Sequence, residues 1–258
     1  MTSIAQQIEE VAQLIIDADN IVIFTGAGIG VPSGIPDFRS PGGIWEKYDP
    51  YEVSTMRAFK KNPERVWEFF RELYDSFSDP EPNLAHYAVT EIQQLKGSDK
   101  VHIVTQNIDS LHKKAGAENV FEIHGNGEVM HCYKCGFEEV FEEEKHLKTL
   151  PYPKCPKCSK PLKPKAILFE EQLDNNLIQR ALRLAVKSDL IIGIGTSLGV
   201  FPAADVVLAP PPRIKKVIIN LTKTHYDHLI HIRIRGDVVD VLPELVKEIK
   251  KKLENNSV

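Results

Sequence analysis

The four cysteines of the chain fall into two matched pairs. Two residues separate Cys132 from Cys135, two separate Cys155 from Cys158, and nineteen lie between the pairs. Two such pairs are the usual way to bring four thiolates to the corners of one zinc ion. Four unrelated core cysteines explain the matched spacing poorly, and an intracellular setting disfavours disulfides. A closed shell of four thiolates leaves no position for water, so the spacing predicts a structural zinc.

Small or polar residues follow the ends of several short apolar runs. They are Gly26-Ala27-Gly28, Gln106-Asn107-Ile108-Asp109, His124-Gly125, Gly195-Thr196-Ser197 and Asn220. Ligands of open parallel sheets bind outside the carboxyl ends of the strands. A helix-capping role could explain any one of these polar ends. Helix capping is a poor explanation for several polar strand ends together, so the pattern predicts a ligand site at one edge of a sheet.

The first glycine-rich turn matches the dinucleotide-binding fingerprint imperfectly. Its last glycine is Gly30, and Val31 stands where the fingerprint has a glycine or alanine. Glycines here would let backbone N–H groups approach a pyrophosphate, although a simple tight turn explains them about equally well. A Pro-rich loop over residues 32–40 replaces the second strand and its acidic residue. An ordinary hydride-transferring dehydrogenase is therefore a poor fit.

Apolar runs alternate with amphipathic segments along the chain. Runs typical of buried strands are Ile21–Thr25, His102–Thr105, Val120–Ile123, Ala166–Phe169, Leu190–Ile194 and Val217–Ile219. Helical spacing is found over Ile4–Ala18, with a possible capping pair Ser3 and Gln6, and over Pro63–Phe77, Leu84–Leu95, Asn175–Val186 and Val239–Leu253. This alternation predicts an α/β protein with a Rossmann-type, doubly wound parallel sheet.

One stretch interrupts the alternation. Residues 132–165 lack long apolar periods and carry eight Lys against five Glu. We expect a small zinc-binding domain over 126–165, inserted into a Rossmann-type domain built from 1–30, 75–125 and 166–258. Residues 31–74 are expected to form a cofactor-binding loop and a helical module.

Composition narrows the class of protein. The 258 residues include 32 Lys and Arg against 36 Asp and Glu, a net charge of −4. This balance argues against a protein that coats nucleic acid or an anionic membrane, and no stretch is apolar enough to span a bilayer. The first twenty residues carry acidic side chains and no Lys or Arg, unlike a signal or transit peptide. We expect a cytoplasmic protein that binds neither a membrane nor a specific nucleic-acid sequence.

Together these motifs closely resemble one family, the sirtuins, which are NAD-dependent protein deacylases. The resemblance rests on Gly26-Ala27-Gly28, Ser33–Arg39, Thr105–Asp109, His124-Gly125, both cysteine pairs, Gly195–Leu198 and Asn220, all in family order. It implies a cleft between the Rossmann-type domain and the zinc domain, in which NAD meets an acetyl-lysine peptide. NAD would be consumed as a co-substrate, and the acyl group would pass from lysine to ADP-ribose, releasing nicotinamide and O-acetyl-ADP-ribose.

The resemblance also implies roles for individual residues. His124 would be the general base toward a ribose hydroxyl, and Asn107 and Asp109 would position the nicotinamide ribose. Contacts to NAD are expected from Gly26, Ala27, Gly28, Val31, Asp37, Phe38, Arg39, Gln106, Asn107, Ile108, Asp109, Gly195, Thr196, Ser197, Asn220 and Asp237. The peptide would add as a strand between residues 168–171 and 199–202, with Phe169, Glu171, Gly199 and Val200 as substrate-binding residues.

The chain departs from the family pattern at a few positions. The family usually has Phe-Gly-Glu where this chain has Phe169-Glu170-Glu171, which puts peptide affinity and sequence preference in question. Sirtuins that prefer dicarboxylic acyl groups carry a Tyr-x-x-Arg pair, and the matching positions here are Phe70 and Leu73. The sequence therefore predicts a preference for acetyl or longer apolar acyl groups.

Other interpretations of the sequence remain open. A mono-ADP-ribosyltransferase would use the same cofactor chemistry, whereas a non-catalytic NAD- and zinc-binding adaptor would not need a general base. His225, His228 and His231 are spaced by three, but a solvated face explains them better than a metal site does. His86 is expected to make a structural hydrogen bond.

Overall fold

A six-stranded parallel sheet forms the larger lobe of the protein. The computed structural model describes residues 2–76 and 79–255. The strands are β1 (Ile21–Thr25), β2 (Val101–Thr105), β3 (Val120–Glu122), β7 (Leu190–Ile194), β8 (Lys215–Ile219) and β9 (Ile232–Ile234), in the order β3-β2-β1-β7-β8-β9. The order runs outward in both directions from β1 and β7, which is the doubly wound arrangement predicted from the sequence. The carboxyl ends of β1, β2 and β7 lie level, because Thr25 pairs with both Thr105 and Ile194.

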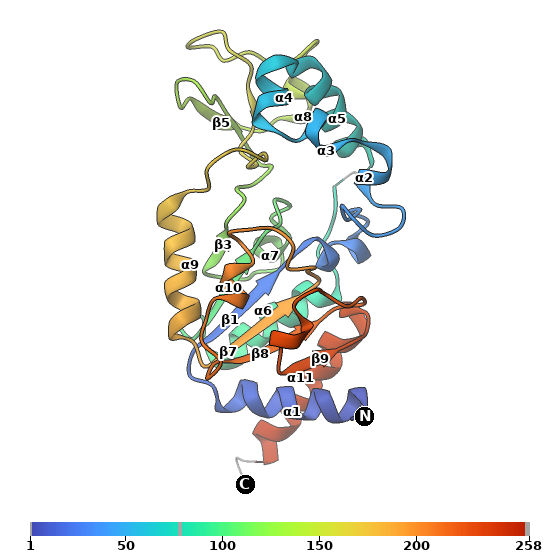
Figure 1. Cartoon of the computed structure of the whole chain (residues 1–258), viewed down its shortest axis with the longest axis vertical. Helices are drawn as coiled ribbons and strands as arrows, with labels where there is room; N and C mark the ends of the chain where they lie inside the picture. The colour runs from blue at the N-terminus through green and yellow to red at the C-terminus, as the bar shows by residue number, and fades with distance from the viewer. Residues whose placement is uncertain (1, 77–78, 256–258) are drawn as a thin grey trace.

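Helices cover both faces of this sheet (Figure 1). Successive residues of a strand point to opposite faces, so Ile21 and Ile23 join one core cluster while Val22 and Phe24 join another. The first cluster includes apolar side chains of α1 (Ile4–Asp17), α6 (Leu84–Lys96) and α11 (Val238–Asn255), and the second those of α9 (Asn175–Lys187) and α10 (Asp205–Leu208).

The helix cap predicted at Ser3 is present, and a second cap of the same kind is found at α6. Ser3 and Gln6 form a reciprocal capping box at the start of α1. Asn83 and His86 do the same at α6, where Nδ1 of His86 accepts a hydrogen bond from the Asn83 backbone N–H. His86 is thus structural, as expected.

The smaller lobe joins two segments that are far apart in the sequence. It contains α2 (Ile44–Lys47), α3 (Pro50–Val53), α4 (Met56–Lys61) and α5 (Pro63–Ser76), together with α8 (Glu143–His146) and the antiparallel strands β4 (Val129–His131), β5 (Glu138–Val140) and β6 (Lys163–Pro164) (Figure 1). One apolar cluster spans both segments, and buried Trp67 of α5 donates its indole N–H to the carbonyl of Leu162, 2.8 Å away. The apolar core of the zinc-binding segment is therefore formed together with the helices of the other segment.

One strand prediction is wrong, and strand β9 was missed. Residues 166–169 form no strand; this stretch is an irregular connection with a single bridge from Phe169 to Thr55. Leu168 packs in the apolar cluster of the smaller lobe instead of against a sheet neighbour. Strand β9 was not predicted, because Ile232-Arg233-Ile234 is short and lies in a charged stretch. Helix α5 is described to Ser76, so the predicted helix end at Phe77 lies outside the described residues.

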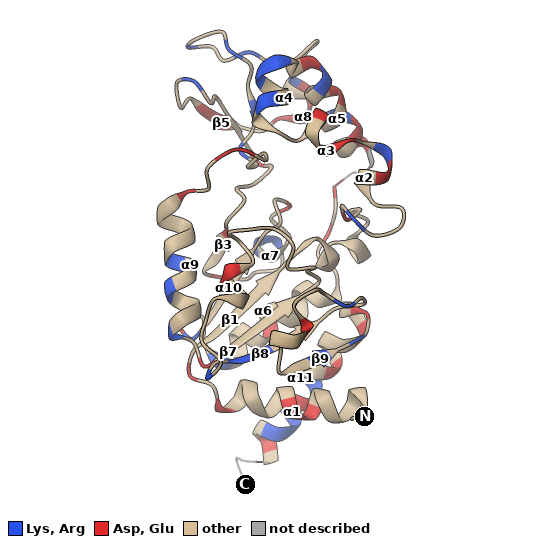
Figure 2. Cartoon of the chain, in the orientation of Figure 1, with Lys and Arg blue, Asp and Glu red and all other residues tan. Residues whose placement is uncertain are grey.

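Among the described residues, no helix combines the length and the apolarity that crossing a membrane requires. Charged residues are spread over both lobes (Figure 2).

Candidate active site at the carboxyl edge of the sheet

The glycine turns that follow β1 and β7 meet at the centre of the sheet, where the strand order changes direction. The N–H of Gly26 donates to the carbonyl of Ile194 at 3.1 Å, and the N–H of Gly28 donates to the carbonyl of Gly195 at 2.8 Å. A Cβ atom on Gly28 would lie 2.8 Å from the Cα of Gly195, and Gly195 itself has a φ of +58°. Larger residues do not fit here, so the glycines are explained by close backbone approach at the crevice where open α/β sheets bind ligands.

Gln106 ties three strand ends together. Its backbone N–H donates to the carbonyl of Thr25 at 3.0 Å, and its side-chain Nε2 donates to Oγ1 of Thr196 at 3.1 Å. Its own carbonyl lies 3.0 Å from Nδ1 of His124. The predicted residues after β1, β2, β3 and β7 are thus in one place.

The contact with Gln106 fixes the tautomer of His124. A carbonyl oxygen only accepts, so Nδ1 must carry the hydrogen, and Nε2 of the neutral ring keeps a lone pair. Burial lowers the pKa of His124, and the Gln106 carbonyl partly opposes that shift. Near neutral pH the ring is therefore an unprotonated base at Nε2.

Asn107 and Asp109 present polar atoms in the same region. Nδ2 of Asn107 is buried and has no partner at hydrogen-bond distance and angle in the described part of the chain, although the Asn107 side chain is close enough to Asp109 to oppose the rise of its pKa. An orphaned buried donor is costly unless a ligand satisfies it. Oδ1 of Asp109 accepts from the Leu111 N–H at 2.9 Å, and burial raises the pKa of this carboxyl group. The carbonyl of Ile108 accepts from the Gly127 N–H at 2.8 Å, so the segment is held from both sides.

A buried network that the sequence did not predict supports this segment. Nε2 of His112 lies 2.9 Å from Oγ1 of Thr25, which donates to Oγ1 of Thr105 at 2.8 Å. Oγ1 of Thr105 in turn accepts the backbone N–H of Asn107 at 3.0 Å. The sequence gives no signal for this network beyond the polar types, because eighty residues separate the two threonines.

The loop after the first glycine turn is held by Asn83 and Asp37. Nδ2 of Asn83 donates to the Ile29 carbonyl at 2.8 Å and to Oγ of Ser33 at 2.9 Å. Oδ1 of Asp37 accepts the backbone N–H groups of Arg39 and Ser40, so this carboxylate shapes the turn. The other expected cofactor contacts of the loop, Val31, Phe38 and Arg39, are exposed there.

The remaining expected cofactor residues lie along the same edge of the sheet. Ser197 is exposed beside the second glycine turn. Asn220 follows β8, and its side chain donates to the Thr222 carbonyl at 3.0 Å. Asp237 follows β9, and its Oδ1 accepts the Val239 N–H at 3.1 Å at the start of α11. The last two side chains therefore have structural partners in this state.

The expected peptide-binding residues differ in exposure and in their hydrogen-bond partners. Phe169 is 43% exposed, Gly199 is exposed, and the Val200 carbonyl accepts from the Ala204 N–H at 2.8 Å. The Glu171 carboxylate instead lies 2.9 Å from Nζ of Lys163 and accepts the Leu168 N–H. Glu171 therefore orders the connection between the lobes, a role that its sequence neighbours did not suggest.

The four cysteines gather at one point in the smaller lobe. Their sulfur atoms all lie within 4.8 Å of one another, with 3.4 Å between Cys132 and Cys158 and 3.5 Å between Cys135 and Cys155. A tetrahedral zinc ion with bonds of about 2.3 Å needs sulfur atoms about 3.8 Å apart, so the residues fit the metal. His131, next to Cys132 in the sequence, lies beside Glu138 and is outside the cluster.

The fold and site define a class of protein: a doubly wound nucleotide-binding sheet with a second lobe that carries a four-thiolate metal centre. Comparison with known proteins agrees, since the pattern of the Sir2 family matches residues 26–202. The chain belongs to the Sir2 family.

Individual relatives match over nearly the whole length. A protein of Pyrococcus abyssi described as an NAD-dependent protein deacylase is 37% identical over 251 residues, which are 96% of this chain and all of the relative. A solved Sir2 homologue in complex with NAD has a TM-score of 0.86 at 34% identity and covers 95% of this chain and 94% of its own. A Sir2 structure with a deacetylated p53 peptide and 3′-O-acetyl ADP ribose has a TM-score of 0.87 at 33% identity. The match covers 93% of this chain and 98% of the Sir2 chain.

Proposed function

We propose that this protein is an NAD-dependent protein lysine deacylase that removes acetyl and longer apolar acyl groups. The observation that carries the proposal is the tautomer of His124, whose contact with Gln106 leaves Nε2 as a base beside the glycine crevice. Family membership and the NAD and peptide complexes of the relatives support it. NAD, when bound, supplies the ADP-ribose that accepts the acyl group, so nicotinamide and O-acetyl-ADP-ribose are the products besides free lysine.

Different residues of the chain have different roles in the proposed reaction. Ser197 and the closely packed backbone of the two glycine turns line the pyrophosphate, while Nδ2 of Asn107 and the Asp109 carboxyl group orient the nicotinamide ribose. Nε2 of His124 takes a proton from a ribose hydroxyl, and the Gln106 carbonyl stabilises the resulting charge at Nδ1. The cysteine site holds zinc as a structural ion and takes no part in the chemistry.

The acyl preference follows from α5. Phe70 is 6% exposed and packs among aromatic rings, and Leu73 carries no charge, so neither position offers a cation to an acyl carboxylate. We infer a cytoplasmic enzyme as well, because thiolates spaced for zinc are maintained where thiols stay reduced.

The test is nicotinamide release from matched acetyl-, myristoyl- and succinyl-lysine peptides, with the peptide mass measured in parallel. We expect acetyl or myristoyl loss to exceed succinyl loss, and His124→Ala to lower kcat/KM by about 10²- to 10⁴-fold. His228→Ala, at an exposed histidine, is the matched control. Gain of an ADP-ribosyl mass would indicate the transferase, and NAD binding without nicotinamide release would indicate the adaptor.

A further inference from the structure

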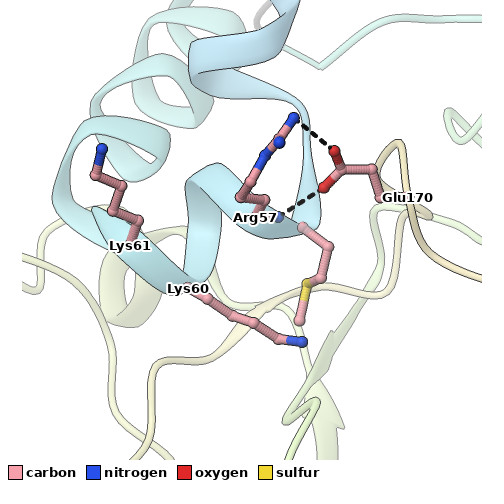
Figure 3. Close-up of a pocket in the computed structure, with 5 residues that line it drawn as sticks. Arg57, Lys60, Lys61 and Glu170 are labelled. Atoms are coloured by element: carbon pink, nitrogen blue, oxygen red, sulfur yellow. Dashed lines mark hydrogen bonds and ion pairs between the residues drawn. The ribbon is translucent and has the colours of Figure 1, made fainter.

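A basic pocket lies beside the expected peptide-binding segment. It has a volume of about 420 Å³ and is lined by Met56, Arg57, Lys60, Lys61 and Glu170. Four of the five come from α4, and Glu170 reaches in from the connection that follows Phe169 (Figure 3). The proposed reaction does not use this pocket.

Glu170 stands where the family usually has glycine, and its backbone has the φ of +71° that favours glycine. Its side chain turns toward α4 and is held there by Arg57 at both oxygens. Nη2 of Arg57 lies 2.8 Å from Oε1, and the Arg57 backbone N–H donates to Oε2 at 3.2 Å (Figure 3). The negative charge of Glu170 is therefore already matched by Arg57.

The two lysines leave the pocket with unbalanced positive charge. Within the described residues, neither Lys60 nor Lys61 has a carboxylate within 4.0 Å, and Nζ of Lys60 lies 5.6 Å from the centre of the Tyr133 ring. Three cations and one carboxylate give the pocket a net charge of about +2. Its electrostatic complement is an anionic group.

The backbone of the segment places a bound peptide next to this pocket. The N–H and C=O of Phe169 are both used by the 54–56 segment, through Ser54 and Met56. Glu170 follows in a turn that the Glu171 N–H closes on the Leu168 carbonyl at 3.1 Å, so the pocket directly adjoins the expected peptide-binding residue Phe169. A side chain of a peptide bound along Phe169 is therefore close to the pocket that Arg57 and the two lysines line.

We propose that this pocket receives an acidic side chain of the substrate, so that the protein prefers acyl-lysines with Asp or Glu within three residues. The inference rests on the proposed function for the identity of the modified lysine. Exposed ion pairs are weak individually, so we expect an acidic residue at the favoured position to improve peptide affinity about fivefold over its amide counterpart, and less at high salt.

The experiment uses acetyl-lysine peptides that differ only by Asp, Asn or Lys at each position from −3 to +3. Binding is measured by fluorescence anisotropy and turnover by nicotinamide release, at low and high salt. A binding preference for Asp at one position supports the pocket, whether or not turnover is seen. Equal binding of the Asp and Asn peptides at every position, or a preference for Lys, overturns it. Absence of nicotinamide release from every peptide tells against the proposed function alone.

Variants assign the preference to the pocket. Lys60→Glu with Lys61→Glu changes the pocket charge from about +2 to about −2, so it should replace the preference for Asp by a preference for Lys and leave affinity for the Asn peptide within about twofold. Lys247→Glu with Lys251→Glu on α11, in the other lobe, makes the same change in net charge and should keep the preference. Glu170→Gln should strengthen it, since Arg57 is then free. A preference that survives the Lys60 and Lys61 change overturns the assignment.

Discussion

The ammonium of Lys163 lies 2.9 Å from the carboxylate of Glu171, and the Lys163 side chain is 2% exposed. The same ammonium donates to the Ala166 carbonyl at 2.7 Å, so the pair fixes the connection between the two lobes. Burial lowers the pKa of Lys163, and Glu171 opposes that shift.

Removing Glu171 should destabilise the protein substantially. Glu171→Ala leaves a buried cation without its partner, which typically costs about 3–5 kcal/mol. Urea unfolding measures the loss. Glu68→Ala is the control, because its pair with Arg65 is exposed and worth about 1 kcal/mol or less. Equal losses in the two variants would contradict the importance of the buried pair.

The pH dependence of turnover should report His124. Because burial lowers its pKa below the ordinary value of about 6.5, the base stays unprotonated into mildly acidic solution. We expect kcat/KM to fall on the acid side with a midpoint below pH 6.5, measured as nicotinamide release between pH 4.5 and 8. A midpoint above 6.5, or an unchanged acid limb in His124→Ala, would exclude His124 as the titrating base.

Stability should decline in acid because two histidines are buried in the neutral form. Burial lowers the pKa of His112 to about 3 and that of His86 to about 4, whereas both titrate near 6.5 in the unfolded chain. Between pH 6.5 and about 4 the unfolded state binds more protons, so the free energy of unfolding falls as pH falls. The slope reaches about 1.4 kcal/mol per pH unit for each histidine.

Urea unfolding between pH 7.5 and 4.5 tests this slope. The variant His112→Gln cannot take up the proton, so its stability should depend less steeply on pH than that of the unchanged protein. Identical slopes would show that His112 does not contribute to the acid sensitivity.

Loss of zinc should loosen the whole smaller lobe. The cysteine segment shares its apolar cluster with α5, including Trp67, which is fully buried. In a Trp45→Phe background, chelation of the metal or Cys132→Ser should shift the Trp67 fluorescence toward longer wavelength. The far-ultraviolet signal of the larger lobe should be largely kept. Unchanged Trp67 emission after complete metal removal would contradict a structural role.

The sequence predicted what depends on local pattern. Cysteine spacing identified the metal cluster, and polar strand ends such as Gln106 and His124 identified one edge of the sheet, because parallel strands end together. Contacts between side chains that are far apart in the sequence could not be predicted. Nothing in the types or spacing of Arg57 and Glu170 predicts their pairing across more than a hundred residues. Glu171 illustrates the same limit, since its partner depends on how residues 163–171 turn between the lobes.

The close approach of Gly28 to Gly195 also bears on how a dinucleotide is received. Main chain packs against main chain at this point, and the Gly28 N–H donates to the Gly195 carbonyl, so the conformation of the turn is set by backbone contacts. Conformational freedom that would otherwise be lost upon association has already been given up during folding. In the proposed role as a phosphate-binding turn, this segment is therefore preorganised before a dinucleotide binds.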